Sequence, residues 1–228
     1  MRYIRSLFSA SVNVIIPSLI MSFMSDENLL GPHYAFLIAL LLPLSYGIYY
    51  LSVEKRYSVF SIIGLISILL TGGFGFMELS HGWMISKETA IPAVIGVVIL
   101  LTGYMKRPFI SVILDEVLDM ESVKKDYKKK GKEKMLSRHI DQANTLFSII
   151  FFIGAILNLV LSLTLLASDP GTPEYASEVG RLAALSFPAI VLPIIILLTI
   201  VFAILAGNIE KSTGNDIMDY MGQKKEGR

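Results

Sequence analysis

Long stretches of this chain contain no charged residue and consist almost entirely of apolar side chains. Residues 89–105, 142–168 and 182–209 are the clearest examples. About 20 apolar residues in a helix are enough to cross the hydrocarbon core of a bilayer. Only 17% of the residues are charged, whereas soluble domains carry about 25%. The sequence therefore predicts an integral membrane protein.

Six segments are long enough to cross a membrane as helices. They lie near residues 6–24, 33–52, 58–77, 88–105, 143–167 and 182–207. Short turns join most of them, so that consecutive spans form antiparallel hairpins. The expected fold is an all-α bundle of six transmembrane helices in a single domain covering residues 1–228. The first span is expected to be retained rather than cleaved as a signal peptide.

Basic residues predict the orientation of these spans. If the amino terminus is cytoplasmic, all of the 20 Lys and Arg residues except Lys87 and Arg181 lie on the cytoplasmic side. Lys and Arg concentrate in the cytoplasmic loops of membrane proteins. Both termini are therefore expected in the cytoplasm, with the turns that carry Asp26, Glu78 and Asp169 outside.

Residues 106–142 form the only long segment between predicted spans. Apolar residues recur at helical spacing from Ile110 to Leu118, which predicts an amphipathic helix lying on the cytoplasmic membrane surface. A lysine-rich stretch follows, and its lysines are candidates for contact with anionic lipid. They are Lys124, Lys125, Lys128, Lys129, Lys130, Lys132 and Lys134. The alternative is a solvated loop whose lysines only fix the topology.

A glycine-rich stretch at the end of the third predicted span is the first candidate for a functional site. Its glycines allow close approach of a neighbouring helix, and charged residues follow near the outer surface. The candidate residues are Thr71, Gly72, Gly73, Glu78, Trp83 and Lys87. The alternative is an ordinary exposed hairpin in which Lys87 forms a salt bridge with Glu78 or with Glu88.

Two amides, Asn13 and Asn158, lie within predicted spans, where an unsatisfied polar group is costly. They are expected either to form hydrogen bonds between helices or to line a polar cavity. Four prolines within spans, Pro17, Pro43, Pro188 and Pro193, are expected to kink their helices.

No sequence motif of a known catalytic site is present. The three histidines, His33, His81 and His139, fall in different loops and are expected at the surface. The chain has no cysteine, which excludes disulfides and thiolate metal sites. Its net charge is only +1, so nucleic acid is not an expected partner. No metal and no cofactor are expected.

Several short motifs between residues 31 and 165 occur together in an order that is typical of one protein family. They are Gly31-Pro32 to Tyr50 followed by Lys55-Arg56, Gly72-Gly73, then Trp83, Lys87 and Thr89, then Lys106-Arg107-Pro108, and finally Asn144 to Asn158 with Phe151-Phe152 and Ala155. In these motifs the chain resembles the intracellular septation protein A family, as a distant, transporter-like relative. It differs in its longer lysine-rich linker and its longer outer loop before the last span. The resemblance implies a bacterial inner-membrane protein linked to envelope upkeep and division, without an established enzymatic reaction.

The expected function is accordingly that of a multi-pass inner-membrane protein without catalytic activity. It would act in cell-envelope homeostasis through contacts with lipid, with a second copy of the chain or with another envelope protein. The alternative is a small secondary transporter of a solute or lipid, built from two inverted sets of three helices. A third possibility is a membrane enzyme that acts on lipid, with His139, Asp141 and Asn144 as its polar cluster.

Overall fold

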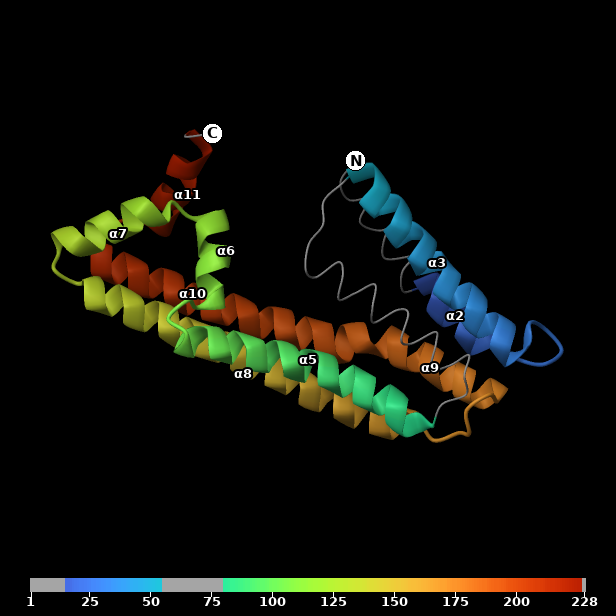
Figure 1. The fold of residues 1–228 in the computed structure, drawn as a ribbon. Coiled ribbons are helices and arrows are strands. Elements are labelled where there is room, and N and C mark those ends of the chain that lie inside the picture. Colours follow the sequence, from blue (N-terminus) through green and yellow to red (C-terminus); the bar gives the residue numbers. More distant parts are fainter. Residues whose placement is uncertain (1–14, 55–79, 227–228) are drawn as a thin grey trace. The chain divides into compact units, whose positions relative to one another are not determined.

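The computed structural model describes residues 15–54 and 80–226, and in these ranges the chain forms helices and turns without any strand (Figure 1). The elements are α2 (Ile16–Phe23), α3 (Gly31–Glu54), α5 (His81–Tyr104), α6 (Phe109–Val117), α7 (Met120–Lys129), α8 (Glu133–Leu165), α9 (Pro173–Ser186), the π-helical turn η2 (Phe187–Val191), α10 (Leu192–Thr213) and α11 (Ile217–Glu226). The predicted all-α class is confirmed for this part of the chain.

Within residues 15–54 and 80–226, four helical segments are long and apolar enough to cross a membrane. They are Gly31–Tyr49, His81–Tyr104, Glu133–Leu165 and Pro173–Thr213. These segments overlap the spans predicted near 33–52, 88–105, 143–167 and 182–207, although the last three begin seven to ten residues earlier than predicted. The span predicted near 58–77 lies outside the described residues, and so does most of the span predicted near 6–24, of which α2 covers the end.

The helix that carries the last predicted span begins nearer the amino terminus than predicted and changes its hydrogen-bonding pattern part-way. Residues 173–181 were expected in a polar outer loop, but α9 already begins at Pro173. Thr172 caps it, since its hydroxyl accepts a hydrogen bond from the Tyr175 N–H at 3.2 Å. Pro188 lies within η2, and Pro193 follows it. Proline has no N–H to donate, so the α-helical ladder is interrupted where two prolines lie five residues apart.

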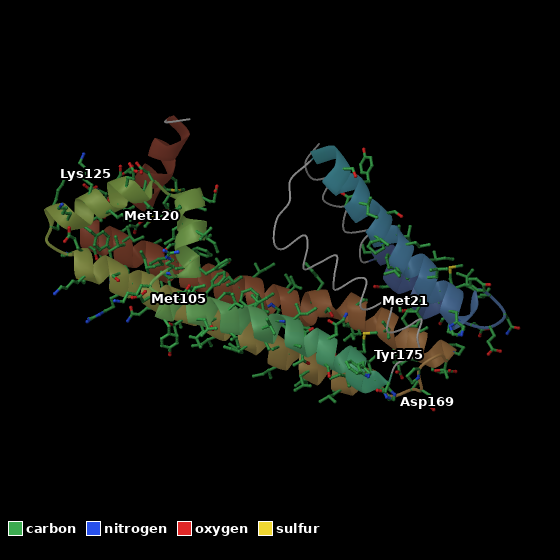
Figure 2. All side chains as sticks on the ribbon, in the orientation of Figure 1. Met21, Met105, Met120, Lys125, Asp169 and Tyr175 are labelled. Atoms are coloured by element: carbon green, nitrogen blue, oxygen red, sulfur yellow. The ribbon has the colours of Figure 1, made fainter. Side chains whose placement is uncertain are left out.

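The described residues divide into two compact units, and the first contains α2, α3, α9, the beginning of α5 and the end of α8. Helices α2, α3 and α9 pack side by side (Figure 1). Tyr175 and Met84 are fully buried in its core, and Figure 2 labels Tyr175 together with Met21 of α2. Gly180 allows α2 to approach α9 closely, because a Cβ atom there would lie 2.9 Å from the Ser18 carbonyl oxygen.

The second unit contains α5 from Ile91, α6, α7, α8 up to Ala155, α10 and α11. Buried residues of α8 recur at intervals of four and three, the spacing with which neighbouring helices interlock. They are Leu136, Ile140, Ala143, Phe147 and Ile150. The first two lie before the predicted start of the span at residue 143. This continuous apolar stripe explains why α8 extends back to Glu133.

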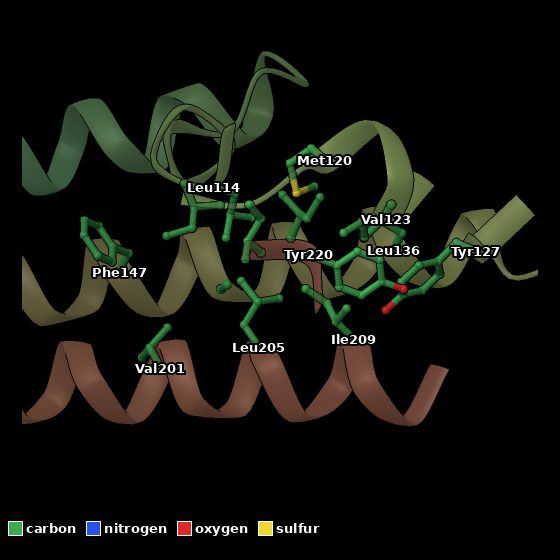
Figure 3. Close-up of a cluster of buried hydrophobic side chains, with 14 of the residues drawn as sticks. Leu114, Met120, Val123, Tyr127, Leu136, Phe147, Val201, Leu205, Ile209 and Tyr220 are labelled. Atoms are coloured by element: carbon green, nitrogen blue, oxygen red, sulfur yellow. The ribbon is translucent and has the colours of Figure 1, made fainter. Parts of the chain in front are cut away.

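A helical cap, which we define as α6, α7, α11 and the adjoining ends of α8 and α10, replaces the expected linker (Figure 1). Its core is shown in Figure 3, where Val123 and Tyr127 of α7 meet Leu136 of α8, Ile209 of α10 and Tyr220 of α11. The predicted amphipathic helix forms as α6, but Ile110 and Leu114 are buried in this core rather than turned towards lipid. The lysine-rich stretch is likewise not a free loop, because it comprises the second half of α7, a short turn and the start of α8.

Candidate functional site

Five of the predicted site residues lie outside the described residues: Asn13, Thr71, Gly72, Gly73 and Glu78. The other three belong to the first unit. Trp83, in the first turn of α5, exposes 57% of its surface, whereas Lys87, one turn further on, exposes only 6%. Lys87 forms an ion pair with Glu88, one of its two predicted partners. Asn158 is half-buried on α8.

A buried amide that was not expected to be structural joins α5, α6 and α8. Asn144 is 1% exposed; its Nδ2 donates to the Ile99 carbonyl at 2.8 Å, and its Oδ1 accepts from the Ile110 N–H at 3.2 Å. One side chain of α8 thus holds the end of α5 and the first turn of α6. Gly103 makes room for it, because a Cβ atom there would lie 3.1 Å from Nδ2.

One turn further along α8, a serine makes a second polar contact with α5. The Ser148 hydroxyl, fully buried, donates to the Gly96 carbonyl at 2.8 Å. A Cβ atom on Gly96 would lie 3.3 Å from ring atoms of Phe152. The interface between α5 and α8 therefore depends on two glycines facing an amide, a hydroxyl and an aromatic ring, as is common between membrane helices.

The cluster of His139, Asp141 and Asn144 does not converge on one point. Both ends of the Asn144 amide are occupied by backbone groups. His139 and Asp141 border a groove of about 760 Å³ between α8 and α10. The Tyr127 hydroxyl lies 3.3 Å from the His139 Nδ1. Among the described residues, no group of three or more His, Cys, Asp or Glu side chains is placed to hold a metal ion.

A polar network fastens α11 to α7. The Asp126 carboxylate accepts hydrogen bonds from the Tyr220 hydroxyl at 3.1 Å, the Asn215 amide at 2.9 Å and the Lys129 ammonium at 2.9 Å. The hydrogen bond from Lys129 is the largest influence that lowers the pKa of Asp126 below its ordinary value, although desolvation opposes it. The Asp119 N–H adds a backbone hydrogen bond to the Tyr220 carbonyl at 3.0 Å.

The structure separates the seven predicted lipid-contact lysines into two groups. Lys129 pairs with Asp126, Lys130 lies against Gly214, and Lys132 donates to the Ser212 carbonyl at 3.3 Å. The other four lysines border grooves. Lys134 borders the groove between α8 and α10. A second groove is bordered by Lys124, Lys125 and Lys128. Figure 2 labels Lys125 on α7.

This second groove, here called the lysine groove, has a volume of about 840 Å³ and lies between the end of α5 and helices α6, α7 and α8. A fourth lysine, Lys106, lines it together with the three of α7. Glu133 and Asp141 of α8 provide two carboxylates, and Leu136 and Ile140 provide apolar surface. With four ammonium groups and two carboxylates, the lining carries a net positive charge and suits an anion.

Four features were not predicted from the sequence: the packing of α7, the burial of Asn144, the docking of Tyr220 and the position of Lys106 in the lysine groove. A signal for α7 was present, since Asp119 precedes apolar residues at positions 120, 123 and 127, a helical spacing after an N-capping residue. The surrounding lysines hid that pattern. No comparable signal marks Tyr220, because its burial depends on residues distant in the sequence.

Comparisons with protein-family models, curated proteins and solved structures give no match to this chain.

Proposed function

We propose that this chain is a multi-pass membrane protein without catalytic activity that contacts anionic lipid through its helical cap. The proposal rests on one observation: the second unit has both an exposed aliphatic surface and an exposed lysine-rich surface. The part of α5 in the second unit exposes aliphatic side chains, including Val94, Val98 and Leu101, each more than half exposed. The cap at the end of that helix exposes lysines.

Such a pairing is the arrangement that a bilayer favours. Exposed aliphatic surface is stable in hydrocarbon, and lysines next to it lie at the level of the headgroups. Each lysine near an anionic leaflet contributes about 1 kcal/mol of attraction. Because basic residues concentrate on the cytoplasmic side of membranes, we place the cap and both termini in the cytoplasm.

The resemblance to the intracellular septation protein A family supports a more specific proposal. In this proposal the chain is a distant relative located in a bacterial inner membrane, where it serves envelope upkeep. The motifs at Trp83, Lys87 and Lys106-Arg107-Pro108 support it. The proposal includes contact with a second copy of the chain or with an envelope protein.

A second candidate function, transport, is favoured by polar atoms inside the first unit. The buried side-chain oxygens of Thr89, Ser162 and Tyr175 have no hydrogen-bond partner among the described residues. The Lys87 side chain, which forms an ion pair with Glu88, is buried two residues before Thr89 in the sequence. Unpaired polar groups within spanning helices often mark a solute pathway. A transporter requires a cysteine at Asn158 to change its accessibility between two conformations, whereas the non-transport proposal requires it to remain unchanged.

Lipid selectivity at the two ends of α5 tests the main proposal. Trp83 is the only tryptophan of the chain and lies at the end of α5 opposite the cap. A variant carrying Trp83→Phe and Met105→Trp, here called the reporter protein, moves the fluorophore next to the cap, where Met105 is 72% exposed. Both proteins are reconstituted in vesicles, and quenching by brominated phosphatidylglycerol is compared with quenching by brominated phosphatidylcholine.

The proposal predicts that the anionic lipid quenches the reporter protein more strongly, and that added salt weakens this preference because it screens exposed charges. Trp83 in the unchanged chain should show no such preference. Equal quenching of the reporter protein by both lipids would contradict the proposal.

A further inference from the structure

We propose that the lysine groove is a specific binding site for the phosphate headgroup of an anionic phospholipid whose acyl chains lie along α5. This inference rests on the proposed function and adds a defined site to it. General attraction would involve every exposed lysine of the cap, whereas the groove involves Lys106 and three lysines of α7.

The backbone of Lys106 is the first observation that points to a site. Lys106 has φ of 54°, the only residue other than glycine with positive φ among those described. It follows the last turn of α5, where the Lys106 N–H bonds to the Gly103 carbonyl and the Arg107 N–H to the Thr102 carbonyl, both at 3.0 Å. This is a Schellman motif, and glycine is the residue that favours its left-handed position.

A side chain in the left-handed conformation is strained, and strain at a non-glycine residue is a reason to look for function. Elsewhere in the described chain the positions with positive φ are glycines, as at Gly131 after α7 and Gly214 after α10. At the end of α5 the chain instead has a lysine whose side chain borders the groove. A glycine would relieve the strain but would remove one of the four ammonium groups.

The second observation is an exposed apolar stripe on α5 whose last residue immediately precedes Lys106 in the sequence. Val94, Val97, Val98 and Leu101 follow helical spacing and are 60%, 44%, 52% and 52% exposed. Met105 continues the stripe, and Lys106 follows it directly. A lipid whose acyl chains cover this stripe therefore has its headgroup beside Lys106.

The composition of the groove indicates the chemistry of its ligand. Lysine ammonium groups donate hydrogen bonds to phosphate oxygens and neutralise their charge. Leu136 and Ile140 provide the apolar side that a lipid headgroup meets where it joins its glycerol backbone. Glu133 and Asp141 can accept hydrogen bonds from headgroup hydroxyls, so a phosphodiester bearing hydroxyls, such as phosphatidylglycerol, fits this lining.

The decisive experiment compares two variants of equal charge in the reporter protein. Lys125→Gln with Lys128→Gln removes two lysines of the groove, and Lys130→Gln with Lys211→Gln removes two exposed lysines that do not line it. The measured quantity is the preference of quenching for brominated phosphatidylglycerol over brominated phosphatidylcholine. The groove variant should lose up to about fivefold per lysine, the equivalent of about 1 kcal/mol each, and the matched variant should lose less than about twofold.

The outcomes separate the inference from the proposed function. Equal losses in both variants would overturn the site and leave a diffuse contact with anionic lipid. No preference in the reporter protein itself would overturn both. Inorganic phosphate, added at an ionic strength matched with chloride, should leave the preference unchanged because it lacks acyl chains. If added phosphate abolished the preference, the groove would be a site for a soluble anion, and the lipid assignment would be overturned.

Substitutions of Lys106 distinguish a role in lipid binding from a purely structural role. Lys106→Gly should lower the preference for phosphatidylglycerol while it leaves the melting temperature unchanged or raises it by about 2–4 °C, because glycine relieves the strained conformation. Lys106→Asn, which also tolerates this conformation, should lower the preference in the same way. A fall in melting temperature in both variants would overturn the argument from strain.

Discussion

Replacing Asn144 by leucine removes the single side chain that joins α5, α6 and α8. The new side chain has a similar volume but neither donates nor accepts a hydrogen bond. Two backbone groups lose a partner, the Ile99 carbonyl and the Ile110 N–H. The consequences for these two groups differ.

The carbonyl of Ile99 retains a partner, because the Thr102 hydroxyl donates to it at 2.6 Å. The Ile99 carbonyl therefore loses only one interhelical hydrogen bond, which contributes about 0.6–1 kcal/mol. Ile110 lies in the first turn of α6, whose N-cap residue Pro108 forms no side-chain hydrogen bond, and it is fully buried. Leaving its N–H unsatisfied costs about 1–3 kcal/mol. We therefore expect Asn144→Leu to lower the free energy of unfolding by about 2–4 kcal/mol.

Thermal unfolding in detergent, combined with hydrogen exchange, measures this effect. Thr145→Val is the matched control, because Thr145 is exposed and its hydroxyl bonds only within α8, to the Asp141 carbonyl. The control should change stability by no more than about 0.5 kcal/mol. In Asn144→Leu, exchange should increase first in the amides of α6. If melting and exchange match those of the control, the amide does not hold α6 in place.

Two further predictions concern helix packing and the cap. Gly180→Ala should destabilise the first unit, since its Cβ atom would lie 2.9 Å from the Ser18 carbonyl, whereas Gly207→Ala, with open space around it, should be neutral or slightly stabilising in the same melting assay. Because the pKa of Asp126 is lowered in the folded chain, its stabilising contribution is present at neutral pH and is lost as the pH falls through 3.8 and below. The difference in melting temperature between the unchanged chain and Asp126→Asn should therefore shrink on acidification; a difference that stays constant with pH would contradict this assignment.

The four long apolar helices could be predicted because a bilayer imposes a characteristic length and composition on the helices that cross it. An uncharged apolar segment such as 182–207 has to satisfy its backbone within one helix, and that requirement is readable without any tertiary contact. The cap could not be predicted in the same way. The burial of Tyr220 depends on α7 and α10, which are far from it in sequence, and the lysines around Tyr127 gave its segment the composition of a solvated loop.

The sequence indicates which segment contains the candidate site, but not which of its side chains come together. Lysine count and the distribution of positive charge made the lysines from Lys124 to Lys134 candidates for contact with anionic lipid, with a solvated loop as the alternative. Which of those lysines border a groove depends on how α7 packs, and that separates Lys125 from Lys130. Lys106 could not be identified from sequence, because its distinguishing feature is a backbone angle.

The central claim is that spanning helices place the cap on the cytoplasmic surface of a membrane. Since the chain contains no cysteine, single cysteines at Lys130 in the cap and at Asp169 before α9 can be labelled without background. Both positions are exposed. In intact cells a membrane-impermeant maleimide should label the cysteine at 169 and should reach the one at 130 only after permeabilisation. Equal labelling of the two in intact cells, or the reverse pattern, would contradict the claim.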